Sequence, residues 1–335
     1  MSDVAKLAGV GTMTVSRVLN GNVFVSEDTT ARVLKAVAQL NYQRNEIARS
    51  LREQRTRQIG VIVPNLHNQF FGTCVHAINR VAEEHSYSTM ITTSDSHPTA
   101  EFTKAKRMLR RHVEGLIIVP AMGKSQMLDP EFNGTPIVTI DNPVPRSPFD
   151  SVVVQNKYGA EIGVQHMIEH RHKRIVFFGS APTKWSIRQR SEGYRIAMEA
   201  AGLKPESHIV SDSMSEMYEL IRSLTTRRVP PTAIFCANNL ITREVLHVLS
   251  KIDLNMPDDI SLVGFDDFEM ADIMKPAITV VRQPVDVMGR VAAELLFSRL
   301  TDSKQPEKPK RIVLPVELVV RNSCGPHRAI TGEKR

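Results

Sequence analysis

The first twenty residues predict two short helices that pack against each other, and this pairing restricts the N-terminal fold more than any other feature. Residues 3–10 read DVAKLAGV, residues 13–20 read MTVSRVLN, and Gly9 lies in the turn between them. In each segment the apolar residues recur at i, i+3 and i+4, which places them on one helix face. These residues are Val4, Leu7 and Ala8 in the first segment and Val15, Val18 and Leu19 in the second. The pattern is that of a helix-turn-helix.

Burial of the two faces leaves the N-terminal half of the second helix exposed. Its outward residues are then Thr12, Met13, Ser16 and Arg17. In helix-turn-helix proteins this part of the second helix contacts base edges in the major groove. The sequence therefore indicates a head that binds double-stranded DNA.

A third helix is expected to close this head. Ser26 is placed to cap its N-terminus, and Glu27 and Asp28 follow in the first turn, where acidic side chains suit the helix dipole. Its expected buried stripe consists of Val33, Val37 and Leu40. The result is a small all-α domain, assigned to residues 1–44.

Residues 45–57 form a short basic segment that is assigned as a hinge helix or linker. Residues 1–58 hold nine Lys or Arg against five Asp or Glu, so most of the chain's net charge of +7 lies near its N-terminus. A basic block on a near-neutral remainder is typical of a nucleic-acid-binding module joined to another domain. The segment itself is too short to be a stable helix alone in water.

From Ile59 onward the pattern changes to alternating strands and helices. Apolar runs of strand type lie at 59–63, 116–119, 136–140, 174–178, 233–237 and 260–265. Amphipathic stretches lie at 70–85, 100–112, 157–170, 189–201 and 239–250. This order predicts an α/β core of parallel sheets covered on both faces.

The core is assigned to residues 58–325, which is long for a single doubly wound sheet, so two α/β lobes fit better. Residues 301–310 are expected to form a polar loop. The chain from Arg321 onward is expected to be loosely packed, and residues 326–335 are assigned as a tail.

Four segments occur in a fixed order: DVAKLAGV, TVSRVLNG, VSEDTTARVLKAVAQLNY and ARSL. In order and spacing they resemble the lactose/galactose-repressor family of bacterial transcription regulators. The resemblance implies two doubly wound lobes of the periplasmic-binding-protein type around a ligand cleft, a homodimer, and a pseudo-palindromic DNA operator. It also implies a hinge helix that folds when two subunits meet on DNA. The DNA contacts it implies are Thr12, Met13, Thr14, Ser16, Arg17 and Asn20 in the head and Ala48, Leu51 and Arg52 in the hinge.

Polar side chains follow several predicted strands, at the edge where doubly wound sheets bind ligands. Asp141 follows the strand at 136–140. Asn238 and Asn239 follow the strand at 233–237, and Asp266 and Asp267 follow the strand at 260–265. Such groups can hydrogen-bond neighbouring hydroxyls of a sugar, or they can cap the next helix. Both interpretations stay open for each residue.

The resemblance favours the ligand interpretation, because Arg190 in RSEGY matches a family segment whose arginine contacts the effector. It implies effector contacts at Phe70, Phe71, Arg190, Asn238, Asp266 and Gln283. Together with Asp141 from the strand ends and with Trp185, they form the predicted effector-binding set. Trp185 could stack on a sugar ring or simply pack in the core. Gln69 and Asn239 stand where family members commonly have proline and aspartate.

Neither metal nor enzyme motifs stand out. Cys74, Cys236 and Cys324 lack CxxC spacing, so no disulfide or zinc site is indicated, and the first two are expected to be buried. The histidines at 166, 170 and 172 are interpreted as surface residues at a helix end. Phosphate-loop, GxSxG and HExxH motifs are absent from the sequence, so we expect no cofactor and no catalysis. A secretory signal and a bilayer-length apolar stretch are also absent, which predicts a cytoplasmic protein without membrane contact.

The sequence thus predicts a ligand-responsive transcription regulator, a repressor of genes for uptake or breakdown of a sugar or a gluconate-like sugar acid. Two alternatives remain. One is a sugar-acting enzyme on an α/β core with a fused DNA-binding head, which turnover of a sugar would support. The other is an architectural DNA-binding protein, which equal affinity for specific and random DNA would support.

Overall fold

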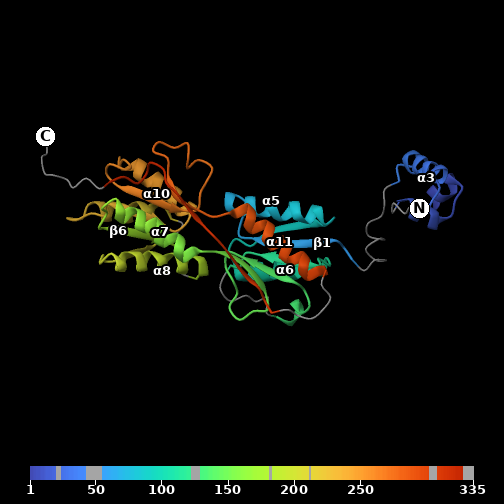
Figure 1. Ribbon diagram of the computed structural model, residues 1–335, viewed down its shortest axis with the longest axis horizontal. Coiled ribbons are helices and arrows are strands. Elements are labelled where there is room, and N and C mark those ends of the chain that lie inside the picture. Colours follow the sequence, from blue (N-terminus) through green and yellow to red (C-terminus); the bar gives the residue numbers. More distant parts are fainter. Residues whose placement is uncertain are drawn as a thin grey trace. The chain divides into compact units, whose positions relative to one another are not determined.

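The computed structural model describes residues 1–19, 24–42, 55–121, 129–180, 183–210, 213–301 and 308–326 (Figure 1). The chain divides into two compact units, Met1–Thr56 and Arg57–Arg335. No helix in the described part of the chain is both long enough and apolar enough to cross a membrane.

The first unit contains three helices: α1 (Ser2–Ala8), α2 (Thr12–Leu19) and α3 (Glu27–Gln39). Gly9 ends α1 with a φ of 66°, and its N–H is directed at the carbonyls of Ala5 and Lys6. This left-handed conformation favours glycine, because a Cβ would be strained there. Ser26 caps α3 by accepting a hydrogen bond from the Thr29 N–H, as the sequence predicts. The buried core of the unit consists of Val4, Ala5, Ala8, Val15, Val18, Val33 and Ala36.

Two expectations about this core are wrong. Leu7 is 51% exposed and Leu40 is 44% exposed, although both were expected to be buried. Ala5 and Ala36 are buried instead. Small side chains at these two positions let α1 and α3 approach closely, and the buried face of each helix is rotated toward them.

The second unit is built on two six-stranded sheets. The N-terminal lobe has the strand order β11-β5-β4-β3-β1-β2, and all of its neighbouring strands are parallel. Its strands are β1 (Gln58–Val63), β2 (Ser88–Thr93), β3 (Gly115–Ile118), β4 (Ile137–Ile140), β5 (Asp150–Val154) and β11 (Arg311–Leu314). Its helices are α5 (Gln69–Glu84), α6 (Pro98–Arg110), α11 (Val285–Thr301) and the short 3-10 helix η2 (Pro130–Phe132). Helices α5 and α11 pack together, and α6 packs against β1 and β2.

The C-terminal lobe repeats this topology, with the strand order β12-β10-β9-β8-β6-β7. Its strands are β6 (Ile175–Gly179), β7 (Glu206–Ile209), β8 (Ala233–Cys236), β9 (Ser261–Phe265), β10 (Thr279–Arg282) and β12 (Glu317–Val319). Its helices are α7 (Asn156–Glu169), α8 (Trp185–Ala200), α9 (Met214–Thr225) and α10 (Asn239–Lys251). Helix α7 packs against α8, α9 packs against α10, and β12 pairs with β10 in the antiparallel direction.

The chain passes between the lobes three times, after β5, after β10 and after β11. Each lobe is therefore assembled from separate stretches of sequence. The architecture confirms the expected pair of doubly wound lobes, with ligand-binding potential at the carboxyl ends of the strands.

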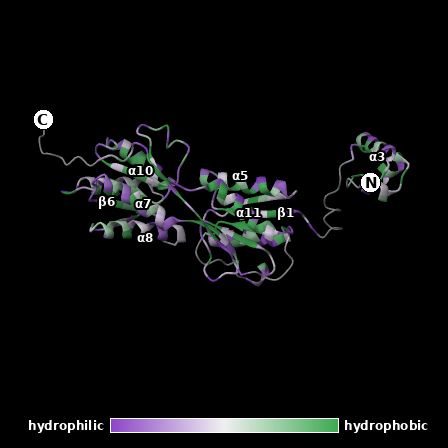
Figure 2. Ribbon diagram, viewed as in Figure 1, coloured by the Kyte–Doolittle hydropathy of each residue, from purple (hydrophilic) through white to green (hydrophobic). Residues whose placement is uncertain are grey.

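All six strands expected from apolar runs are present, because each is a central strand buried on both faces. Figure 2 shows hydrophobic residues concentrated in these strands and hydrophilic residues on the outer parts of the helices. The strands β2, β5, β7, β10, β11 and β12 were not predicted. Strands β2 and β7 lie at sheet edges and are only partly buried, whereas β5 and β10 lie inside their sheets and are largely buried. Helices α9 and α11 were also missed.

The expectation of a loosely packed chain from Arg321 onward is wrong. The Ser323 side chain is fully buried and its carbonyl accepts a hydrogen bond of 2.8 Å from the Leu262 N–H. The Arg321 guanidinium lies 2.8 Å from the Asp267 carboxylate. These contacts attach residues 321–325 to the sheet of the C-terminal lobe.

Candidate functional site

A cavity of about 570 Å³ is lined by residues of both lobes. It lies at the carboxyl ends of the central strands, since Pro64, Asp141, Ser180, Asn238 and Asp266 follow β1, β4, β6, β8 and β9. Seven of the eight expected effector-binding residues line it, namely Phe70, Phe71, Asp141, Arg190, Asn238, Asp266 and Gln283. A volume of this size suits a small organic ligand.

Arg190 is the most constrained side chain of the cavity. It is 3% exposed, and its Nε donates to Asn156 Oδ1 at 2.7 Å. Its Nη1 donates to the Ala237 carbonyl at 2.7 Å, and its guanidinium carbon lies 3.7 Å from the centre of the Phe265 ring. Helix α8 begins at Trp185 rather than near Arg190, so Arg190 lies in the second turn. Because the group is held on several sides, it presents a fixed positive charge to the cavity.

Two aspartates face this charge from opposite lobes. Arg190 Nη1 lies 3.5 Å from Asp266 Oδ1, and Arg190 Nη2 lies 3.9 Å from Asp141 Oδ1. Asp141 also accepts hydrogen bonds from Ser186 Oγ at 3.2 Å and from Asn142 Nδ2 at 2.7 Å. Burial raises the pKa of Asp141, and the charge of Arg190 partly opposes this rise.

The same two aspartates have unusual backbone conformations. The φ of Asp141 is 65° and the φ of Asp266 is 75°. Residues other than glycine adopt this region rarely and at a cost, which is found most often where side chains must be aimed at a site. Both carboxylates lie within 4 Å of the Arg190 guanidinium at the point where their strands end.

Gln283 and Asn238 line the cavity and also hold other groups in place. Gln283, on the chain passage after β10, is 4% exposed and donates from its Nε2 to Asp266 Oδ1. Its Oε1 is buried without a hydrogen-bond partner among the described residues. Asn238 caps α10 by accepting from the Ile241 N–H at 2.9 Å. The capping interpretation and the cavity-lining interpretation thus both hold for Asn238.

Phe70 and Phe71 supply the apolar part of the cavity. Asn68 caps α5 by accepting from the Phe70 N–H at 3.1 Å, which places both aromatic rings in the first turn of the helix. The two rings meet edge to face with centroids 5.1 Å apart. A rigid aromatic pair of this kind can pack against the carbon face of a ligand.

The structure reveals an inter-lobe contact that the sequence analysis missed. The buried amides of Asn68 and Asn239 bond reciprocally, at 3.3 Å from Asn68 Nδ2 to Asn239 Oδ1 and at 2.9 Å in the opposite direction. Nearby, the Glu269 N–H donates to Gln69 Oε1 at 2.8 Å. Gln69 and Asn239 both differ from the residues common in the resembled family, and each supplies an amide that binds across the lobes. These two differences were the only features of the sequence that pointed to the contact.

Two residues that the sequence analysis named as candidates do not line the cavity. Trp185 does not line it, because this residue begins α8 on a different side from Ser186 and Arg190, and its ring lies 5.8 Å from the Arg311 guanidinium. Asp267 does not face it either. Its carboxylate binds the guanidinium groups of Arg282 and Arg321, which lowers its pKa against the opposing effect of burial.

Two of the three histidines near the end of α7, which were expected at the surface, are buried, and His170 is half-buried. His166 is 8% exposed and His172 is 2% exposed. His172 bonds Thr232 Oγ1 at 2.9 Å and the Gly325 carbonyl at 3.0 Å. They are buried because the C-terminal segment, which was expected to be loosely packed, lies over this end of α7. Cys74 and Cys236 are buried as expected, and burial raises the pKa of the Cys74 thiol to about 12.

In the first unit, the face expected to read DNA is exposed on α2. Thr12 and Arg17 are exposed, Met13 is 71% exposed, and Thr14 and Ser16 are half-buried. The remaining expected contacts, Asn20, Ala48, Leu51 and Arg52, lie outside the described residues.

Comparisons with known proteins agree with both halves of this description. Residues 1–45 match the family model for bacterial regulatory proteins of the lacI family, and residues 164–324 match that for a periplasmic binding protein-like domain. The chain is 32% identical over 334 residues to the ribose operon repressor of Escherichia coli K12, covering 97% of this chain and 99% of that one. It is 31% identical over 329 residues to the HTH-type transcriptional repressor PurR of Haemophilus influenzae, covering 96% of this chain and 98% of the relative.

Solved structures give the same result. A lac repressor dimer bound to operator and the anti-inducer ONPF superposes with a TM-score of 0.84 at 26% identity, over 96% of this chain and 98% of that chain. A ribose-bound regulator of Enterococcus faecium has a TM-score of 0.72 at 22% identity, over 81% of this chain and all of that one, and supports the fold alone.

Proposed function

Because the chain belongs to the lacI family of bacterial regulatory proteins, we propose that it is a repressor whose affinity for an operator is set by a sugar bound between its lobes. The observation that carries this proposal is the buried group of Arg190, Asp141 and Asp266 in a cavity shared by two lobes. Fixed charges of both signs offer paired hydrogen bonds to adjacent hydroxyls of a polyol.

The balance of charge in the cavity favours a neutral sugar over a sugar acid. Arg190 and Lys184 contribute two positive charges to the lining, while Asp95, Asp141, Glu244 and Asp266 contribute four acidic groups. Arg190 is already within 4 Å of two carboxylates, so an anionic ligand would compete with them. The name of one relative, a ribose operon repressor, makes ribose the first candidate.

The inter-lobe contacts suggest how a ligand changes the protein. Asp141, Asn142 and Asn68 belong to the N-terminal lobe and bind Arg190, Ser186 and Asn239 of the C-terminal lobe. A ligand that binds Asp141, Arg190 and Asp266 differently in two arrangements of the lobes shifts the balance between them. We propose that this shift alters the dimer and, through it, the folding of residues 45–57 on DNA.

The head is proposed to read DNA through the exposed face of α2. Arg17 and Thr12 can hydrogen-bond base edges. Met13 cannot make such bonds, so we propose that it packs against a thymine methyl group. Two heads in a homodimer then read two half-sites of a pseudo-palindromic operator. The core is proposed to act by binding, without turnover of its ligand.

The proposal is tested by the thermal unfolding of the full chain in the presence of neutral sugars and sugar acids. A bound ligand raises the apparent Tm because it binds only the folded state. We expect a neutral sugar, with ribose as the first probe, to raise Tm and to be recovered unchanged afterwards. The shift should vanish in Asp266→Asn and persist in Asp272→Asn, a matched change at an exposed aspartate outside the cavity. A shift that survives Asp266→Asn, or conversion of the sugar to product, contradicts the proposal.

A further inference from the structure

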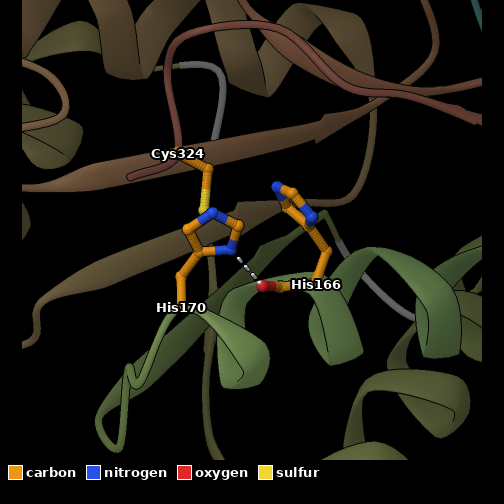
Figure 3. Close-up of side chains that lie close together, drawn as sticks. All are labelled: His166, His170 and Cys324. Atoms are coloured by element: carbon orange, nitrogen blue, oxygen red, sulfur yellow. Dashed lines mark hydrogen bonds between the residues drawn. The ribbon is translucent and has the colours of Figure 1, made fainter. Parts of the chain in front are cut away.

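Three metal-ligating side chains meet on the C-terminal lobe, outside the cavity. His166 lies in the last turn of α7, His170 is the C-cap residue of that helix, and Cys324 lies on the C-terminal segment after β12 (Figure 3). One ligand atom from each lies within 4.8 Å of the other two. None of the three residues lines the effector cavity. The cluster therefore needs an explanation of its own.

The orientation of His170 leaves one ring nitrogen available. Its Nδ1 lies 2.9 Å from the main-chain carbonyl of His166, drawn as the dashed line in Figure 3. A carbonyl can only accept a hydrogen bond, so Nδ1 is the donor in this contact, and the contact leaves Nε2 unused. A ring nitrogen that donates to a backbone carbonyl is the usual support of a metal-bound histidine, because it fixes the ring and the tautomer.

His166 has a buried nitrogen that no described residue satisfies. The residue is 8% exposed, and its Nε2 has no hydrogen-bond partner in the described part of the chain. Buried polar atoms are nearly always paired, so an orphaned one calls for a ligand or an ion.

Cys324 is held in place from both sides. The Leu262 N–H donates to the Ser323 carbonyl at 2.8 Å, and the Gly325 N–H donates to Ser261 Oγ at 3.2 Å. The sulfur therefore has a fixed position beside the two imidazoles.

We propose that His166, His170 and Cys324 bind one divalent transition-metal ion of the zinc type. Two imidazole nitrogens and one thiolate form a donor set that zinc accepts, with the fourth position taken by water. Tetrahedral bonds of about 2.0 Å to nitrogen and 2.3 Å to sulfur require the ligand atoms to lie about 3.3–3.6 Å apart, so the three side chains must draw together from their present spacing of up to 4.8 Å. Binding forms a metal–sulfur bond and releases the thiol proton to solvent. The ion would fasten the C-terminal segment to α7.

The test is a titration of the full chain, stripped of metal with a chelator, with Co²⁺ and then Zn²⁺. We expect one Co²⁺ per chain, with the near-ultraviolet thiolate-to-cobalt absorption band, and displacement of Co²⁺ by Zn²⁺. Zn²⁺ should also raise the apparent Tm of the stripped protein. His170→Gln should weaken binding by about tenfold or more, since the ligand is replaced by a poorer donor. Cys324→Ser should abolish the thiolate band.

The control is His247→Gln, which changes an exposed histidine of α10 outside the cluster and should bind Co²⁺ like the unmodified chain. If a variant does not fold, the Co²⁺ titration of the unmodified chain alone tests the proposal. Absence of the thiolate band in that chain overturns the proposal. Persistence of the band in folded Cys324→Ser overturns it as well, because another thiol would then be the ligand.

Discussion

Replacement of Arg190 by alanine is the change whose effect the structure defines best. The guanidinium is 3% exposed and makes hydrogen bonds to Asn156 and Ala237 at 2.7 Å each. Its removal leaves two carboxylates, Asp141 and Asp266, in a poorly hydrated cavity without their cation. Loss of one partner of a buried ion pair typically costs about 3–5 kcal/mol of unfolding free energy. We expect Arg190→Ala to lower the unfolding free energy by an amount in that range at pH 8. We also expect this variant to lose its response to the effector.

The loss of unfolding free energy in Arg190→Ala, called the deficit below, should depend on pH in a defined direction. Burial already raises the pKa of Asp141 above its ordinary value of 3.8, and Arg190 is the largest of the influences that lower it. Without Arg190 the pKa of Asp141 rises further. A carboxyl with a raised folded pKa takes up a proton more readily in the folded state, so stability falls as the pH rises from 3.8 through the folded value. The deficit of Arg190→Ala should therefore be smaller at pH 5 than at pH 8.

Urea unfolding of the chain and its variants at both pH values measures these effects. The double variant Arg190→Ala/Asp141→Asn should recover part of the loss at pH 8, because one stranded charge is removed. Arg195→Ala, on the exposed face of the same helix, is the matched control and should change stability little at either pH. An equal deficit at pH 5 and pH 8, with no recovery in the double variant, would refute the reasoning.

Three further predictions concern other parts of the chain. Arg17→Ala should weaken specific operator binding by about 1–3 kcal/mol in a fluorescence anisotropy titration and spare random DNA, whereas equal loss on both excludes a base contact. Leu51→Ala, in the hinge segment outside the described residues, should reduce operator affinity and DNA bending while dimerisation persists. Bending is measured by the gel mobility of circularly permuted operator fragments, and unchanged bending would show that the segment is only a linker. Glu101 is 3% exposed, accepts a hydrogen bond from the Ala121 N–H, and has a pKa raised by burial from 4.5 to about 7. Because the carboxyl must ionise while buried, the unmodified chain loses unfolding free energy as the pH rises between those two values. The unfolding free energy of Glu101→Gln, measured with urea, should therefore be higher than that of the unmodified chain by up to about 3 kcal/mol at pH 8 and equal to it at pH 4. An equal difference at both pH values contradicts this assignment.

The sequence predicted what depends on local patterning. Central strands such as 59–63 and 260–265 are continuous apolar runs because both faces of a parallel sheet are buried. Polar residues directly after such strands, Asp141 and Asp266 among them, reach the cavity because the fold brings these strand ends together. Edge strands such as β2 carry no such signal, since their residues are partly exposed.

What escaped prediction depends on contacts between residues far apart in the chain. Asn68 and Asn239 are separated by 171 residues, and their reciprocal amide pair follows from the placement of two helix N-termini. Cys324 lies beside His166 because a short C-terminal segment pairs with the sheet over α7. Neither relation has a periodicity or a spacing that a single sequence reveals. Leu7 is an example of a wrong prediction from local patterning. Its helical spacing predicted burial, but Leu7 is exposed and the smaller Ala5 is buried instead.

The central claim is that one ligand, bound between the lobes, changes the affinity of the head for its operator. The most direct test measures the operator Kd of the full chain with and without the sugar found in the thermal panel, using an operator selected from random duplex DNA. It also measures the Kd for that sugar with and without operator. Linkage requires the two ratios to be equal, and we expect the same factor, about 5–150-fold, in both directions. A sugar that binds tightly in the cavity and leaves the operator Kd unchanged contradicts the account.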